Sequence, residues 1–196
     1  MRYLPLSDHR AHVIPSDTSK FEGWYFRLTD KDGLNPIAII PGISTSLHDP
    51  HAFLMILDGT GKRSYRFKHP TSSYRFTDHP FSISVDQSNF SLSNMIMAAQ
   101  GDFPVKGTLS FTDERPWKGS FFNPRAMGFF GFIPFLQCYH GVLRMSCKIQ
   151  GSLSVNGSAI DYSEGRCYIE KDWGPSFPSS WIWSQSSHFP DRITSL

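Results

Sequence analysis

Two carboxylates, a lysine and several aromatic side chains are concentrated near the end of the sequence. If residues 166–173 form a strand, Glu170 and Asp172 share one of its faces, while Lys171 and Trp173 share the other. A carboxylic acid in poorly solvated surroundings keeps its proton near neutral pH, and aromatic faces stabilise nearby positive charge. This pattern suits the protonation of an apolar substrate. The competing interpretation is a structural salt bridge beside a core strand.

A second aromatic group follows at once. In a strand over residues 180–185, Trp181, Trp183 and Gln185 would align on one face. Such a face could form one wall of a site for an apolar ligand. A packed aromatic core is the alternative.

The N-terminal run Phe21 to Phe26 contains a further candidate group. As a strand, it places Glu22 and Trp24 on one face and Tyr25 on the other. We take Trp24 and Tyr25 as candidate ligand contacts. Glu22 is either a site carboxylate or the partner of a basic residue in the core.

His140 follows Tyr139 in an aromatic segment. It is a candidate for a substrate hydrogen bond or a proton relay, with Tyr139 as a substrate contact; a hydrogen-bonded core histidine is the alternative. We expect no metal site, because no histidine pair has a convincing third ligand. The sequence has no nucleophile elbow, phosphate loop or dinucleotide fingerprint, which argues against hydrolases, kinases and dehydrogenases.

The composition argues against a nucleic-acid partner and is compatible with an apolar ligand. A formal charge of +2, with scattered Lys and Arg, gives no nucleic-acid footprint. Aromatic residues make up 15% of the chain and charged residues only 18%, so part of the apolar surface could line a ligand cavity. Three cysteines form no CxxC pair, and residues 1–9 lack the apolar core of a secretory signal. We therefore expect reduced, buried cysteines in a cytoplasmic protein.

The elements that must position these residues are strands. Short runs rich in β-branched and aromatic residues alternate with turn sequences, of which Asn156-Gly157 is the strongest hairpin signal. The predicted strands cover residues 21–29, 36–41, 52–57, 64–68, 81–85, 90–94, 105–111, 141–149, 152–155, 158–161, 166–172 and 180–185. This pattern predicts an all-β fold: an antiparallel lipocalin-like β-barrel or a strongly curved sandwich.

No linker divides the chain, so we expect residues 1–196 to form a single β-rich domain without an internal boundary. The abrupt end favours the N-terminal portion of a longer two-domain β protein. The most apolar segment, Met127 to Cys138, is interrupted by glycines and Pro134. It fits a buried or membrane-touching loop better than a spanning helix, which leaves peripheral membrane contact open.

Three segments together resemble the tocopherol cyclase family: Phe21-Glu22-Gly23-Trp24-Tyr25-Phe26, Phe135-Leu136-Gln137-Cys138-Tyr139-His140-Gly141-Val142, and Tyr168 through Gln185. The resemblance implies lipocalin-like β domains in members longer than this chain. It also implies an activity, in which a phenolic hydroxyl adds across the first double bond of a prenyl tail on a benzoquinol and closes a chromanol ring. No redox cofactor or metal is implied. The chain departs from the family at Gln137, where an acidic residue is expected, and at Cys167, where a glycine is expected.

On this basis the leading hypothesis is an acid-catalysed cyclase of a prenylated aromatic or other isoprenoid lipid. Asp172 or Glu170 would protonate the alkene, and nearby aromatic rings would stabilise the carbocation. The alternative from another class is a noncatalytic lipocalin-like carrier of an apolar ligand, and a third is a β-sandwich interaction module whose aromatics are all core. A cyclase needs an enclosed carboxyl beside an apolar cavity, whereas a carrier needs only the cavity.

Overall fold

The computed structural model describes residues 10–120, 124 and 126–186. The N-terminal stretch 1–9, for which we expect no secretory signal, lies outside these residues. The strands are β1 (Phe21–Thr29), β2 (Ile37–Ser44), β3 (His51–Asp58), β4 (Arg63–His69), β5 (Tyr74–Thr77), β6 (Ser82–Val85), β7 (Ser88–Ser91), β8 (Asn94–Ala99), β9 (Val105–Arg115), β10 (Tyr139–Val155), β11 (Ser158–Asp161) and β12 (Arg166–Gly174). Two short 3-10 turns, η1 (Thr71–Ser73) and η2 (Gly128–Phe132), accompany them.

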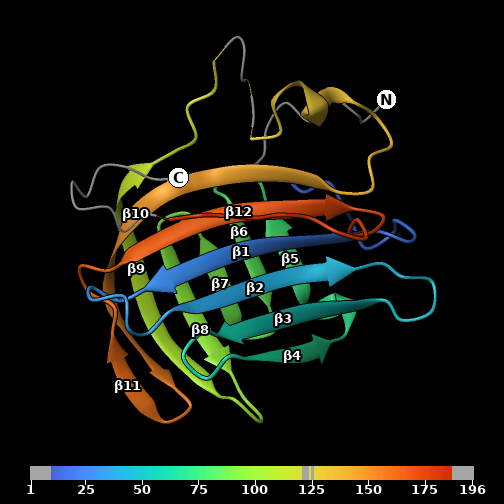
Figure 1. Cartoon of the computed structure of the whole chain (residues 1–196). Coiled ribbons are helices and arrows are strands. Elements are labelled where there is room, and N and C mark those ends of the chain that lie inside the picture. Colours follow the sequence, from blue (N-terminus) through green and yellow to red (C-terminus); the bar gives the residue numbers. More distant parts are fainter. Residues whose placement is uncertain (1–9, 121–123, 125, 187–196) are drawn as a thin grey trace.

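All twelve strands belong to one antiparallel sheet that curls into a half-barrel (Figure 1). Its order is β4-β3-β2-β1-β12-β10-β9-β8-β7-β6-β5, and β11 pairs with β10 outside this path. The N-terminal strand β1 therefore lies beside the last strand, β12, with Tyr25 opposite Glu170. The predicted all-β, curled antiparallel fold is confirmed.

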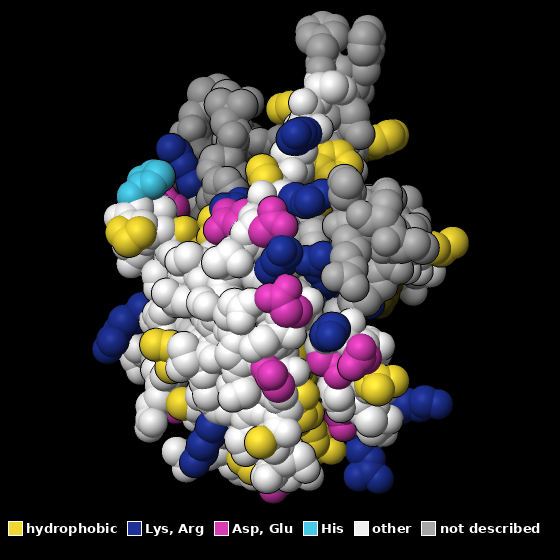
Figure 2. All heavy atoms as spheres, turned by 90° about the vertical axis from the view of Figure 1, so that its left-hand side faces the viewer, with side chains coloured by type: hydrophobic (Ala, Val, Ile, Leu, Met, Phe, Trp, Pro, Cys, Tyr) yellow, Lys and Arg dark blue, Asp and Glu magenta, His cyan; other side chains and the backbone are white. Residues whose placement is uncertain are grey.

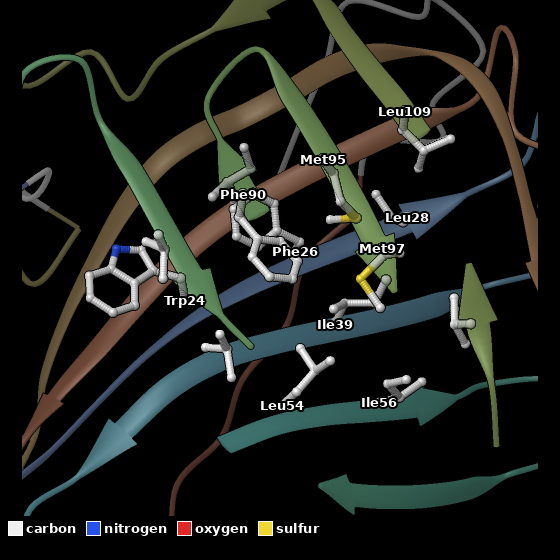
Figure 3. Close-up of a cluster of buried hydrophobic side chains, with 14 of the residues drawn as sticks. Trp24, Phe26, Leu28, Ile39, Leu54, Ile56, Phe90, Met95, Met97 and Leu109 are labelled. Carbon is white, nitrogen blue, oxygen red and sulfur yellow. The ribbon is translucent and has the colours of Figure 1, made fainter. Parts of the chain in front are cut away.

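The alternation of side chains in β1 shows why the sheet curls around a core. Glu22, Trp24, Phe26 and Leu28 have no exposed surface, and all four lie on the concave face. Buried residues of β2, β3, β5 to β10 and β12 complete this core, and Figure 3 shows part of it. Burial of large apolar side chains on one face of each strand provides the main driving force for closing the sheet.

The Asn156-Gly157 hairpin forms as predicted. Val155 pairs with Ser158 across a two-residue turn. Asn156 and Gly157 have φ angles of 49° and 85°. These values match the left-handed conformation that a tight hairpin turn with Asn-Gly requires.

Strand β10 is longer than predicted. The sequence divides it at Gly151, whereas the structure continues it from Tyr139 to Val155. Gly151 has a φ of 116°, and a Cβ there would lie 2.5 Å from the carbonyl oxygen of Thr108. The glycine therefore permits close approach of β9 at a bend in the strand rather than ending it.

The structure differs from the prediction in three elements. Residues 180–185 form no strand, and β5 and β8 were not predicted as separate elements. The short β5 alternates buried and exposed side chains over only four residues, which is too short for a clear period. The 180–185 segment is held by side-chain contacts to β1 and β12 instead of by a strand ladder.

The cysteines form no disulfide bond, and charges of both signs are mixed on the surface shown in Figure 2. All three cysteines are free; Cys147 and Cys167 are buried as predicted, but Cys138 is only half-buried. The face of the molecule in Figure 2 carries Asp and Glu side chains beside Lys and Arg side chains, without a patch of one sign. Within the described residues, no helix has the length and apolar character needed to cross a membrane.

Candidate functional site

The three residues predicted to carry chemistry meet on the convex face of the sheet. His140 in β10 lies opposite Asp172 in β12, and Glu170 is two residues away on the same face. His140, Glu170 and Asp172 each offer a polar atom, and these atoms all lie within 4.8 Å of one another. We call these three residues the convex-face triad. Antiparallel pairing brings it together from positions 30 residues apart in the sequence.

The histidine lies between the two carboxylates. His140 Nδ1 is 2.9 Å from Asp172 Oδ1, and Nε2 is 3.7 Å from Glu170 Oε2. An Asp172 carboxylate that accepts a hydrogen bond from Nδ1–H fixes the neutral tautomer in which Nε2 is the basic nitrogen. This arrangement suits proton exchange between His140 and Glu170.

Glu170 has the environment of a proton donor. Its burial raises the pKa of its carboxyl above the ordinary value, although His140 and two hydrogen bonds oppose the shift. Those bonds come from the Tyr168 hydroxyl at 2.6 Å and the Trp183 indole nitrogen at 2.9 Å, both donating to Oε2. Desolvation favours the uncharged acid, which is the form needed for protonating an alkene.

Aromatic side chains cover this carboxyl. The rings of Tyr25 and Trp183 meet edge to face at 5.6 Å, and Tyr168 lies 6.3 Å from Trp183. Burial, together with the charge of Glu170, raises the pKa of Tyr25 to about 12. Tyr25 therefore stays a neutral phenol, and its ring can face a developing positive charge.

The predicted ligand contacts divide into separate groups. Tyr25 and Trp183 lie beside the convex-face triad. Gln185, two residues after Trp183, accepts hydrogen bonds from Arg27 of β1. Trp181 does not join them, because it is 64% exposed and contacts Phe177 instead. The absence of a strand at 180–185 explains this difference, since only a regular strand would align Trp181 with Trp183.

Trp24, Trp173 and Tyr139 lie on the opposite, concave face. Trp24 is a core side chain that stacks on Phe76 at 5.6 Å. Trp173 stacks on Tyr139 at 5.5 Å, and both line an apolar cavity of about 330 Å³. The cavity is bounded by residues 131–136 on one side and residues 12–20 on the other. This apolar cavity is thus separated from the convex-face triad by the sheet.

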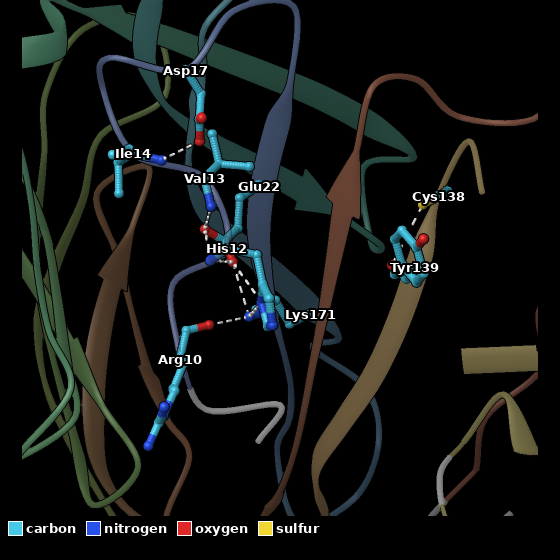
Figure 4. Close-up of polar contacts among 9 residues, drawn as sticks. All are labelled: Arg10, His12, Val13, Ile14, Asp17, Glu22, Cys138, Tyr139 and Lys171. Carbon is cyan, nitrogen blue, oxygen red and sulfur yellow. Dashed lines mark hydrogen bonds and ion pairs between the residues drawn. The ribbon is translucent and has the colours of Figure 1, made fainter. Parts of the chain in front are cut away.

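A second buried polar cluster lies beside this cavity. Lys171 Nζ is 2.8 Å from Glu22 Oε1, and both side chains are fully buried. His12 lines the cavity, stacks on Trp173 at 4.2 Å and lies 2.7 Å from Lys171 Nζ (Figure 4). Of the two readings of Glu22, the structure supports the core ion pair.

Electrostatics keep Glu22 ionised. Burial by itself raises the pKa of Glu22, but the charge of Lys171 and hydrogen bonds from His12 and Lys171 outweigh it and lower the pKa overall. The backbone amides of His12 and Val13 donate to the same carboxylate at 3.0 to 3.1 Å. This carboxylate is therefore a poor proton donor, in contrast to Glu170.

Sequence reasoning missed two residues of these clusters. Tyr168 has the same strand parity as Glu170 two residues later, so alternation alone could have placed it at the site. His12 gave no signal, because it lies outside any strand and meets Lys171 only after β1 and β12 have paired. The two positions at which the chain departs from the expected pattern lie apart from the triad: Gln137 is exposed and Cys167 is buried in the core.

Several solved structures are similar to this chain at low sequence identity. The structure of CghA with Sch210972 is 11% identical, with 80% of this chain and 46% of that chain covered and a TM-score of 0.48. A protein described as AttH from Nitrosomonas europaea is 14% identical, with coverages of 87% and 60% and a TM-score of 0.49. Kievitone hydratase from Nectria haematococca is 14% identical, with coverages of 79% and 47% and a TM-score of 0.43. This chain spans about half the length of these structures.

The sequence comparisons give a more specific result. No curated protein matches the chain. The sequence profile of the tocopherol cyclase-like family matches residues 111–195, a range that includes His140, Glu170 and Asp172. Over these residues the resemblance predicted from the sequence is confirmed, and the chain carries a tocopherol cyclase-like segment.

Proposed function

We propose that this protein is a cyclase-like enzyme that protonates an apolar, prenylated aromatic substrate at the convex-face triad. The observation that carries the proposal is the convergence of His140, Glu170 and Asp172, in which Glu170 has a raised pKa. The match of residues 111–195 to the tocopherol cyclase-like family supports the reaction class. A prenylated benzoquinol that closes to a chromanol is the substrate we favour.

The proposed cycle conserves every proton. Glu170 donates its proton to the less substituted carbon of the alkene, which leaves a tertiary carbocation facing Tyr25 and Trp183. The phenolic oxygen attacks this cation, the C–O bond forms, and the phenolic proton passes to His140 Nε2. His140 then returns the proton to Glu170, 3.7 Å away. Asp172 orients His140 and stabilises its charged form.

The test is incubation of the purified protein with prenylated hydroquinones, followed by chromatography and mass spectrometry. Cyclisation gives a chromanol of unchanged mass and shifted retention. Glu170→Gln and Asp172→Asn should each reduce the rate by at least about a hundredfold, because general acid–base catalysis contributes about 10²–10⁴. Asp113→Asn is the matched control, since Asp113 is half-exposed and pairs only distantly with Lys148, at 4.0 Å. Wild-type rates in both triad variants would overturn the proposal.

A carrier remains the second candidate, because of one specific observation. The cavity of about 330 Å³ is lined by Trp173, Tyr139 and residues 131–136, on the opposite face from Glu170, so it is not the cavity that a cyclase needs beside its acid. A cyclase substrate would lie instead against Tyr25, which lines a separate pocket of about 380 Å³ and pairs with Glu170 across the strands. A carrier would bind an isoprenoid ligand saturably in the cavity beside Trp173 and release it unchanged. Its affinity would fall in Trp173→Ala and stay constant in Asp172→Asn. A cyclase at the triad would show the opposite sensitivity in its turnover.

A further inference from the structure

We infer that the segment from Phe129 to Phe135 is a docking surface for the face of an anionic lipid bilayer. The inference concerns how the protein meets an apolar ligand, and it holds whether or not the convex-face triad is catalytic. It depends on the exposure of this segment, its anchoring, its charge and its place beside the cavity.

The first observation is the exposure of large apolar side chains. Five of them within seven residues have much of their surface in solvent: Phe129 (59%), Phe130 (67%), Phe132 (42%), Ile133 (44%) and Phe135 (92%). Single exposed apolar residues are common on proteins, but a contiguous group marks an interaction surface. We call these five residues the aromatic loop.

The second observation is that the fold holds the loop in this arrangement. The short turn η2 overlaps the loop, and the backbone amides of Phe130 and Ile133 donate to the carbonyl oxygens of Met127 and Phe130, respectively. The Tyr139 hydroxyl donates to the carbonyl oxygen of Ile133 at 2.9 Å. Phe135 has a φ of 67°, a value that bulky side chains rarely adopt. In Figure 1 this turn stands above β10 and β12, away from the core. The apolar side chains are thus presented outward by an anchored backbone.

The third observation is the charge of the surrounding sequence. Between Glu114 and Asp161 the chain contains Arg115, Lys118, Arg125, Arg144 and Lys148 but no Asp or Glu. Lys118, close before the loop in the sequence, is exposed. Arg144 and Lys148 pair with Glu114 and Asp113. Residues 113–160 still have a net charge of +3. Apolar side chains within a stretch of net positive charge complement the anionic headgroups and acyl boundary of a bilayer.

A second group of exposed apolar side chains, Trp181 and Ile182, lies outside the aromatic loop. Ile182 is fully exposed and Trp181 is 64% exposed, and this group adjoins the carboxyl of Glu170 through Trp183. Docking through this group would cover the convex-face triad, on the opposite side of the sheet from the cavity. We therefore expect the protein to bind the bilayer with the aromatic loop facing the lipid and the convex-face triad facing away from it.

The docking also gives the cavity a source of ligand. Phe132, Ile133 and Phe135 form part of the cavity wall as well as part of the exposed surface. A loop inserted at the acyl boundary would place the cavity mouth against lipid. An apolar molecule could then pass from the bilayer to Trp173 without crossing water.

The test is co-sedimentation of the purified protein with sucrose-loaded vesicles. One set contains phosphatidylcholine alone, and the other contains phosphatidylcholine with phosphatidylserine. We expect wild-type protein to bind the anionic vesicles more tightly, with the difference reduced by salt. Phe130→Ser combined with Phe135→Ser should weaken binding by about tenfold or more, because it removes two of the large apolar side chains whose transfer from water into the acyl region would drive binding.

The matched control is Leu34→Ser combined with Ile182→Ser. These side chains are 71% and 101% exposed and lie outside the loop, so vesicle binding should be unchanged. Equal binding by wild type and the loop variant would overturn the inference. So would a wild-type protein that ignores vesicles but forms a dimer that the loop variant abolishes, since the patch would then be a self-association surface. Because binding is measured without turnover, failure here is distinguishable from failure of the proposed cyclase activity.

Discussion

Lys171 and Glu22 form a fully buried ion pair across β12 and β1, with 2.8 Å between Nζ and Oε1. Lys171 lies between Glu170 and Asp172 in sequence, but strand alternation turns its side chain to the other face. There its ammonium group lies 4.5 Å from the centre of the Trp173 ring. The cation is thus matched by Glu22, and Glu170 keeps the raised pKa that a proton donor needs.

Breaking this pair should destabilise the fold strongly. Glu22→Gln or Lys171→Met leaves an uncompensated buried charge, which costs about 3–5 kcal/mol of unfolding free energy. The double variant should recover much of the loss. Asp17→Asn, which removes the partly exposed pair with Lys20, should cost about 0–1 kcal/mol. Urea denaturation measures all four, and a loss below about 1 kcal/mol in both buried variants would contradict the assignment.

The same pair gives the stability a pH dependence. Because the folded-state pKa of Glu22 is lowered from 4.5, its contribution is present above that pH and is lost as the pH falls through the folded value. The stability difference between wild type and Glu22→Gln should therefore shrink below pH 4.5. A difference that stays constant on acidification, measured by urea unfolding in a pH series, would exclude this linkage.

Glu170 should show the opposite dependence. Its folded-state pKa is raised above 4.5, so its contribution is complete below that pH and declines as the pH rises through the folded value. Glu170→Gln removes the ionisable group, so the variant should gain stability relative to wild type on the alkaline side. Thermal unfolding of both proteins across this range provides the comparison. Parallel curves would show that burial does not shift this carboxyl.

Tyr168 should act as a positioning residue for Glu170. Its hydroxyl donates to Oε2 at 2.6 Å, and this bond opposes the rise in the pKa of Glu170. Tyr168→Phe should therefore raise that pKa further and move the alkaline limb of any cyclisation rate profile to higher pH, with the ring packing kept. A lower rate with an unmoved limb would indicate a structural role only.

The Asn156-Gly157 hairpin offers a test of the fold alone. Gly157 has a φ of 85° and nothing within 4 Å of the position where a Cβ would stand, so Gly157→Ala is penalised by backbone strain rather than by a clash. We expect a loss of about 1 kcal/mol. Ser158→Ala at the next, exposed position should have little effect. Equal stabilities by chemical denaturation would argue against this turn conformation.

The sequence by itself determined which residues share a face. Alternation within a strand is local, so Glu170 with Asp172, Glu22 with Trp24, and the Asn156-Gly157 turn could all be predicted. The family resemblance was also readable from contiguous motifs. Even the separation of Lys171 from the two acids followed from strand parity.

Only the tertiary structure decided what those faces meet. Strand order placed β12 between β1 and β10, which brought His140 to Asp172 and Glu22 to Lys171. His12 and the irregular 180–185 segment take positions set by contacts distant in sequence, which no local period records. The core fills the concave face, so the cavity forms at its margin and the triad on the other side. Packing between distant segments, unlike alternation, has no signature in a short stretch of sequence.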